Sequence, residues 1–103
     1  MNIRISKLYV GGPNALVEVA FNRDPQGHAM IARIQEATGH VFARPPANLH
    51  ARRELHLAPI PDPAELERVY ILARQVAAEY GVVHDSQKEM HGPDDRAAER
   101  GGA

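Results

Sequence analysis

The sequence predicts an α+β domain in which two helices cover one face of an antiparallel sheet. Two observations carry this prediction: a long amphipathic helix within residues 62–81, and short segments of alternating apolar and polar residues on both sides of it. The chain has 103 residues, which is enough for one domain with a modest core. An apolar helix stripe has to be buried, and a sheet of short strands offers a surface for it.

The long helix has start and stop signals as well as an apolar stripe. Asp62 is a good N-cap, Pro63 fits the first helical position, and Glu65 completes the pattern of a capping box. Gly81 is expected to end the helix in the left-handed conformation. The residues expected to be buried recur at three- and four-residue steps and are Leu66, Val69, Tyr70, Ala73, Val76, Ala77 and Tyr80.

The start of the chain predicts a β-hairpin. Residues 2–10 and 15–22 have strand-like patterns, and a glycine-rich turn separates them. The apolar parity of the first strand changes after Ile5, which predicts a bulge near Ser6–Lys7. In the second strand the residues that share the apolar side are Val17, Val19 and Phe21.

A shorter helix is predicted next, because Asp24 and Pro25 repeat the N-cap pattern and Gly39 can close the helix. Residues 40–44 and 51–58 then predict two strands on either side of a proline-containing loop.

In the second of these strands, Leu55 and Leu57 are expected to point into the core. Arg52, Glu54 and His56 are expected to point outwards. Residues 82–84 begin a short last strand.

The predicted order of elements is (β)β-α-β-β-α-β, which without its first strand is the split pattern of ferredoxin-like folds. We expect residues 1–91 to form a single α+β domain. Residues 92–103 lack apolar anchors and are expected to be a flexible C-terminal tail. The sheet face without helices is either open or paired with a second subunit.

Composition narrows the classes of function. The chain has no cysteine, which excludes a disulfide framework and thiolate chemistry. The formal net charge of −1 gives no overall attraction to nucleic acid. A signal-peptide pattern and a membrane-length apolar run are both missing, so a cytoplasmic protein without membrane contact is expected.

The segment Leu72 to Asp85, LARQVAAEYGVVHD, resembles the RraB-like regulators of ribonuclease E activity. In that family a helix ending in glycine runs into a short strand, and the order of elements over residues 15–85 also fits. The family's aromatic and glycine positions after the aspartate are Ser86, Gln87 and Lys88 here, and its acidic character is missing. The resemblance implies a small inhibitor that binds another macromolecule and has no active site.

The residues themselves also favour a non-catalytic role in protein binding. The basic stretch that contains Arg44, Arg52 and Arg53 has too few aromatic residues near it to form a platform on which nucleic-acid bases could stack. Arginine is enriched in protein interfaces, so we expect a regulator or inhibitor that acts by direct contact with a larger enzyme or complex. Such a protein is either chromosomal or encoded by a phage or mobile element. The predicted partner-binding residues are Arg44, Arg52, Arg53 and His56.

Two alternatives remain. The first is a small dimeric α+β barrel enzyme, of the isomerase or cofactor-free monooxygenase type, with His56 and Glu54 as its acid–base pair. The second is a metal site built from His50, His56 and His84. No histidine pair has a recognised ligand spacing, so neither a metal nor a cofactor is expected.

Overall fold

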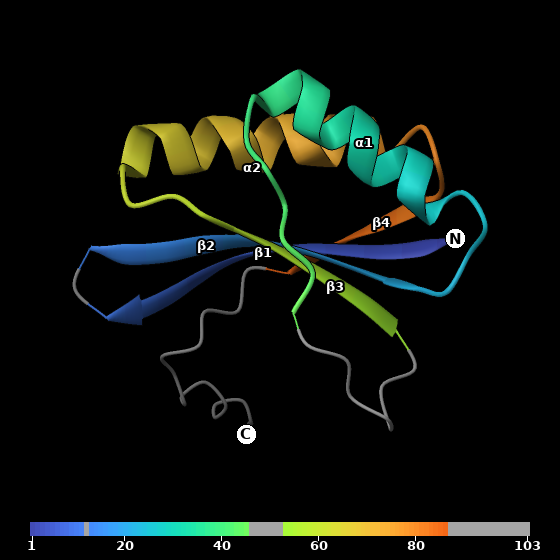
Figure 1. Cartoon of the computed structure of the whole chain (residues 1–103), viewed down its shortest axis with the longest axis horizontal. Coiled ribbons are helices and arrows are strands. Elements are labelled where there is room, and N and C mark those ends of the chain that lie inside the picture. The colour runs from blue at the N-terminus through green and yellow to red at the C-terminus, as the bar shows by residue number, and fades with distance from the viewer. Residues whose placement is uncertain (12, 46–52, 87–103) are drawn as a thin grey trace.

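The computed structural model describes residues 1–11, 13–45 and 53–86 of the chain. They form a four-stranded mixed sheet with two helices packed on one of its faces (Figure 1). The predicted tail at residues 92–103 lies outside the described residues. The elements are β1 (Asn2–Gly11), β2 (Asn14–Asn22), α1 (Gly27–Thr38), β3 (Arg53–Pro59), α2 (Pro63–Ala77) and β4 (Val82–Ser86).

The strand order is β3-β2-β1-β4. β1 and β2 form the predicted hairpin, and β3 pairs antiparallel with β2. β4 pairs with β1 in parallel, so the sheet is mixed and the prediction of an antiparallel sheet was wrong at this edge. The predicted bulge near Ser6–Lys7 was also wrong, because the ladder is regular through Tyr9 and shifts only between Tyr9 and Gly11.

The core lies between the sheet and the two helices. The α2 residues predicted to be buried are buried, except Tyr80, which is partly buried and packs against the core. Burying one such aliphatic or aromatic side chain contributes roughly 1.5–3 kcal/mol, so the stripe anchors α2 to the sheet. The strand residues with the same role are Ile3, Ile5, Val17, Val19 and Phe21.

α2 begins as predicted and ends differently. The Asp62 carboxylate accepts a hydrogen bond from the Glu65 backbone N–H at 3.1 Å. The helix stops at Ala77, and Gly81 does not have a positive φ. A Cβ at Gly81 would lie 2.1 Å from the Met1 carbonyl oxygen, so this glycine is required by close backbone approach rather than by a helix cap.

α1 begins two residues later than predicted. Asp24 accepts a hydrogen bond from the Gln26 backbone N–H at 2.9 Å, and Gln26 is the N-cap of a helix that starts at Gly27. A Cβ at Gly27 would lie 2.2 Å from the Phe21 ring, so only glycine fits here without movement. Gly39 ends α1 in the left-handed conformation with φ 78°, as predicted.

The segment after α1 forms less sheet than predicted. Residues 40–44 make no strand, and a single bridge joins Ala43 to Leu57 through two backbone hydrogen bonds of 2.8 Å. This segment therefore lies beside the outer edge of β3.

The predicted parity of β3 was wrong. His56 pairs with Val19 and Ala58 with Val17, so both side chains share the buried face of β2. Leu55 and Leu57 consequently lie on the face without helices, where they are half-buried.

Candidate functional site

The sheet face turned away from the helices, here called the open face, is the candidate functional surface (Figure 1). Residues on it alternate along each strand with the core residues. Half-buried leucines occupy one part of the open face, namely Leu8, Leu16, Leu55 and Leu57. The part nearer the start of β1 is polar and basic.

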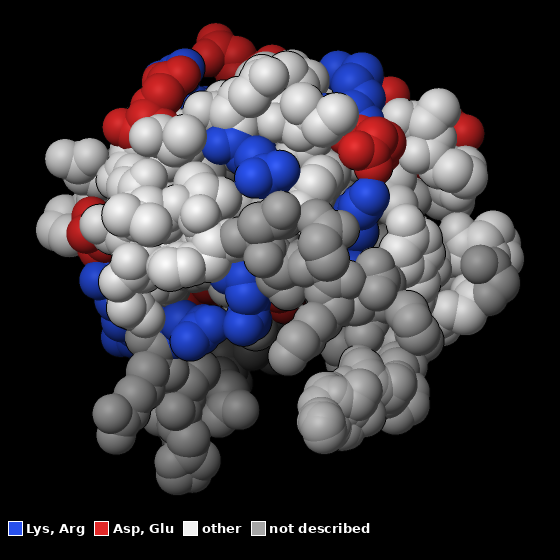
Figure 2. All heavy atoms as spheres, turned by 180° about the vertical axis from the view of Figure 1, so that it is seen from behind, with Lys and Arg blue, Asp and Glu red and all other residues white. Residues whose placement is uncertain are grey.

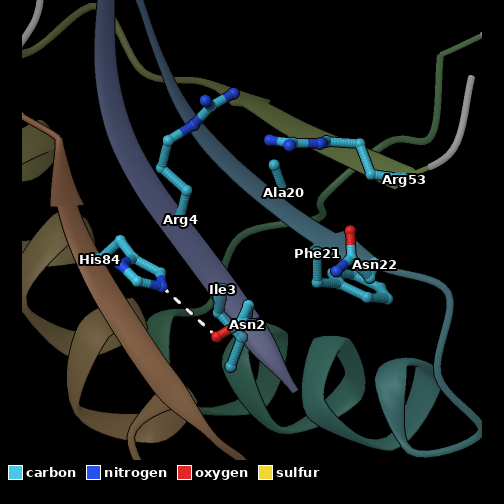
Figure 3. Close-up of a pocket in the computed structure, with 8 residues that line it drawn as sticks. All are labelled: Asn2, Ile3, Arg4, Ala20, Phe21, Asn22, Arg53 and His84. Atoms are coloured by element: carbon cyan, nitrogen blue, oxygen red, sulfur yellow. Dashed lines mark hydrogen bonds between the residues drawn. The ribbon is translucent and has the colours of Figure 1, made fainter.

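A hollow of about 390 Å³ opens in this basic part (Figure 3). We call it the basic hollow. Ala20 supplies its floor, because a methyl group stands there between the longer side chains of Arg4 on β1 and Leu55 on β3. The lining residues are Asn2, Ile3, Arg4, Ala20, Phe21, Asn22, Arg53 and His84.

Three strands bring two arginines and a histidine to the basic hollow. Arg4 is the Cα partner of both Ala20 on β2 and His84 on β4, which places an arginine and a histidine on one row. Arg53 is the first residue of β3 and pairs with Asn22. Its side chain extends over β2 towards Arg4 (Figure 3).

The guanidinium groups here are weakly neutralised. The Arg4 Nη2 atom lies 3.6 Å from Glu18 Oε1, which is longer than a hydrogen bond. Within the described part of the chain, Arg53 has no hydrogen bond or ion pair. His84 Nε2 lies 3.4 Å from Asn2 Oδ1, and no carboxylate belongs to the described lining.

Basic and acidic side chains are unevenly distributed over the molecule. In the view from behind, one group of basic side chains lies below the helical layer and other basic side chains lie on that layer, whereas most acidic side chains in view lie along its top (Figure 2). On the helical side, charges are paired: Lys7 lies 2.6 Å from Glu67, and Arg33 lies 2.6 Å from Glu79. Arg4 and Arg53 on the open face are therefore less closely paired than these two cations.

The predicted partner-binding residues fall in different places. Arg53 lines the basic hollow, and Arg52 lies outside the described residues. Arg44 does not line the hollow; its Nη2 atom lies 3.3 Å from Glu54 Oε2 beside the edge of β3. His56 is 6% exposed, so the prediction that its side chain is on the exposed side was wrong.

His56 lies in the helix-covered layer beside Glu54. Its ring is stacked on Phe21 with centroids 5.8 Å apart, and its Nε2 atom lies 3.7 Å from Glu54 Oε1. Burial lowers the pKa of His56, while the Phe42 backbone and the Glu54 carboxylate act in the opposite direction. Both ring nitrogens and Glu54 Oε1 are buried without hydrogen-bond partners in the described structure.

Among the described residues, the side chains predicted for the acid–base pair do not line the hollow, and those predicted for the metal site do not come together. Neither Glu54 nor His56 lines the basic hollow. His56 and His84 lie on opposite faces of the sheet, and His50 lies outside the described residues. In residues 1–11, 13–45 and 53–86, no group of three potential metal ligands comes together.

Sequence reasoning missed Arg4, His84 and the two asparagines of the basic hollow. The sequence could have predicted that Arg4 lies on the open face, because Arg4 stands between Ile3 and Ile5 and successive side chains of a strand point to opposite faces. His84 could not be placed beside it, since that requires the parallel pairing of β1 with β4.

Comparison with known proteins does not assign the chain to a family. No protein-family model, no curated protein and no solved structure matches the chain. No helix in the described ranges is long and apolar enough to span a membrane. The function is therefore inferred from the residues and their geometry.

Proposed function

We propose that this protein is a small non-catalytic binding module that regulates a larger enzyme or complex by direct contact. The open face of the sheet is its docking surface, and the partner presents apolar residues flanked by carboxylates. One observation carries the proposal: half-buried leucines and weakly neutralised arginines lie side by side on a sheet face that neither of the two described helices covers.

The leucines supply the apolar part of this docking surface. Leu16 and Leu8 are Cα partners on neighbouring strands, and Leu55 and Leu57 continue the apolar area on β3. Interfaces gain their free energy mainly from such apolar contacts at the centre, surrounded by polar groups. A partner that covers these side chains removes apolar surface from water.

Charge selects the kind of partner. Arg4 and Arg53 present guanidinium groups on the open face, whereas Glu18 is largely shielded, with a side-chain exposure of 13%. Complementary charge speeds encounter and disfavours partners of like charge. An acidic protein surface is therefore the fitting partner for this face.

We further propose that the chain belongs to the ferredoxin-like group. β2, α1, the Ala43 bridge, β3, α2 and β4 follow the split βαβ order, with β1 inserted between β2 and β4. This arrangement supports the RraB-like interpretation, because α2 leads through Gly81 into β4 as that family requires. A regulator of a ribonuclease is one form of the proposed role.

The enzyme alternative finds less support. A general base must reach the proton that it removes. The His56 nitrogens and Glu54 Oε1 are buried in the helix-covered layer, where a substrate cannot contact them without rearrangement.

The proposal is tested by affinity capture, with the mass of the complex measured by light scattering. The double variant Leu16→Gln/Leu55→Gln is compared with wild type and with Ile71→Gln, a control on α2 where the side chain is 44% exposed. We expect wild type and the control to retain one partner at fixed stoichiometry, and the double variant to lose it while keeping a cooperative thermal transition.

Capture that is unchanged in the double variant would rule out the open face as the docking surface. A wild-type protein that forms a compact homodimer through the same leucines, with no other partner, would replace the partner with a second copy of this chain.

A further inference from the structure

We propose that the basic hollow is an oxyanion site, and that it holds one carboxylate of the docking partner between Arg4 and Arg53. The proposal rests on the proposed function, since it names the group on the partner that this part of the open face recognises. The leucines provide the apolar contact area, and the basic hollow fixes the position of the partner on the sheet.

The donors come from both sides of the hollow. Arg4 stands on β1, and Arg53 reaches in from the start of β3, so the floor at Ala20 lies between two guanidinium groups (Figure 3). Asn22 beside Arg53 adds an amide that can donate further hydrogen bonds. His84 lies on the row of Arg4 and contributes a ring nitrogen at the rim.

The electrostatic balance favours an anion in this position. Arg53 has no counter-ion among the described residues, and Arg4 approaches Glu18 no closer than 3.6 Å. Two cationic groups facing the same space repel each other, and an anion between them relieves that repulsion. Hydrogen bonds from guanidinium to an oxyanion are about twice as strong as neutral ones.

A carboxylate fits this site better than a nucleic-acid phosphate. The planar guanidinium fork matches a carboxylate with two parallel hydrogen bonds. Recognition of single-stranded nucleic acid relies on aromatic side chains for base stacking. Among the described residues of the open face no Phe, Tyr or Trp side chain is available for it, because Phe21, which lines the hollow, is buried in the core. The volume of about 390 Å³ leaves room for the side chain that carries the carboxylate.

The test is a titration followed by amide chemical shifts at constant ionic strength. The probes are an acetylated Leu-Glu-Glu-Leu peptide, inorganic phosphate and sodium chloride. We expect the peptide to shift the amides of Arg4, Asn22, Arg53 and His84, and phosphate and chloride to shift them only at much higher concentration.

Two variants change the hollow in different ways. Arg53→Gln removes one guanidinium, and Ala20→Val fills the floor without changing any charge. Each should weaken peptide binding about tenfold. Arg53→Gln removes a charge-assisted contact, whereas the valine side chain in Ala20→Val occupies space that the carboxylate needs. Arg33→Gln, which removes a paired arginine of α1, is the matched control and should bind the peptide like wild type.

Several results would overturn the proposal. Peptide shifts that survive both Arg53→Gln and Ala20→Val would mean diffuse attraction by the whole surface. Phosphate binding at the same amides, tighter than the peptide, would assign the hollow to phosphate instead. Absence of shifts with every probe would mean that the hollow is not an anion site.

Failure of this proposal is distinguishable from failure of the proposed function. If Leu16→Gln/Leu55→Gln loses the captured partner and Arg53→Gln keeps it at full affinity, the docking surface stands and the carboxylate site is wrong. If the peptide binds in the hollow but no partner depends on the leucines, the oxyanion site stands without the regulator.

Discussion

The imidazole of His56 is buried in the helix-covered layer, although His56 belongs to β3, a strand at the edge of the sheet. Its nearly parallel contact with the Phe21 ring is favourable and offsets part of the cost of removing the imidazole from water. The two ring nitrogens remain without partners, and an unsatisfied buried polar group costs about 1–3 kcal/mol. The neutral form of the ring is the one that burial favours.

Protonation of His56 should destabilise the fold. Burial lowers its folded-state pKa below the ordinary value of 6.5, so the unfolded chain binds a proton first as the pH falls. The contribution of His56 to stability is therefore complete above pH 6.5, and it declines from there towards the folded-state pKa. His56→Leu should remove this part of the pH dependence and should be near neutral or stabilising at pH 7.5.

Urea unfolding at pH 7.5, 6.5 and 5.5 measures this difference. His28→Gln, at an exposed position of α1, is the control and should keep the wild-type slope. Parallel pH profiles for wild type and His56→Leu would contradict the predicted role of burial.

The start of α2 is the element whose local chemistry is best defined. Asp62 caps the helix, and Glu65 binds Arg68 and His40. Arg68, followed by His40, lowers the pKa of Glu65 to about 2. Arg68 also donates to the Thr38 carbonyl oxygen at 2.8 Å, so this cluster joins the end of α1 to the first turn of α2.

Loss of the cap at Asp62 should weaken the whole domain. Asp62→Ala removes the acceptor for the Glu65 backbone N–H and is expected to cost about 0.5–2 kcal/mol. Asp62→Asn keeps a capping oxygen and should stay close to wild type. Chemical denaturation of the three proteins measures this, and equal losses in both variants would show that capping is not the cause.

The two-layer architecture depends on one face of α2. Val76 is 5% exposed and packs in the core, whereas Ile71 on the same helix is 44% exposed. Val76→Asp places an unpaired charge in an apolar environment, at a cost that is large against a typical domain stability of about 5–15 kcal/mol. We expect Val76→Asp to lose its cooperative thermal transition and Ile71→Asp to keep it.

A cooperative melt of Val76→Asp near the wild-type temperature would mean that α2 packs through another face. Circular dichroism during heating is sufficient for this comparison, because both variants introduce the same side chain into the same helix.

The sequence by itself determined the features that rest on local patterns. The stripe of α2, its cap at Asp62, the left-handed Gly39 and the β1–β2 hairpin each depend on residues a few positions apart. Helix periodicity and capping chemistry act over these short distances. In the candidate site, a cluster of basic residues close together in the sequence pointed to Arg53, which lines the basic hollow.

Only the tertiary structure decided the features that depend on pairing between distant strands. The side to which β3 turns His56 is set by its register with β2, and a shift of one residue would reverse it. The parallel pairing of β4 places His84 beside Arg4, and pairing across β2 brings Arg53 to the same hollow. Packing against the whole sheet fixes that register, and no short stretch of sequence contains the information.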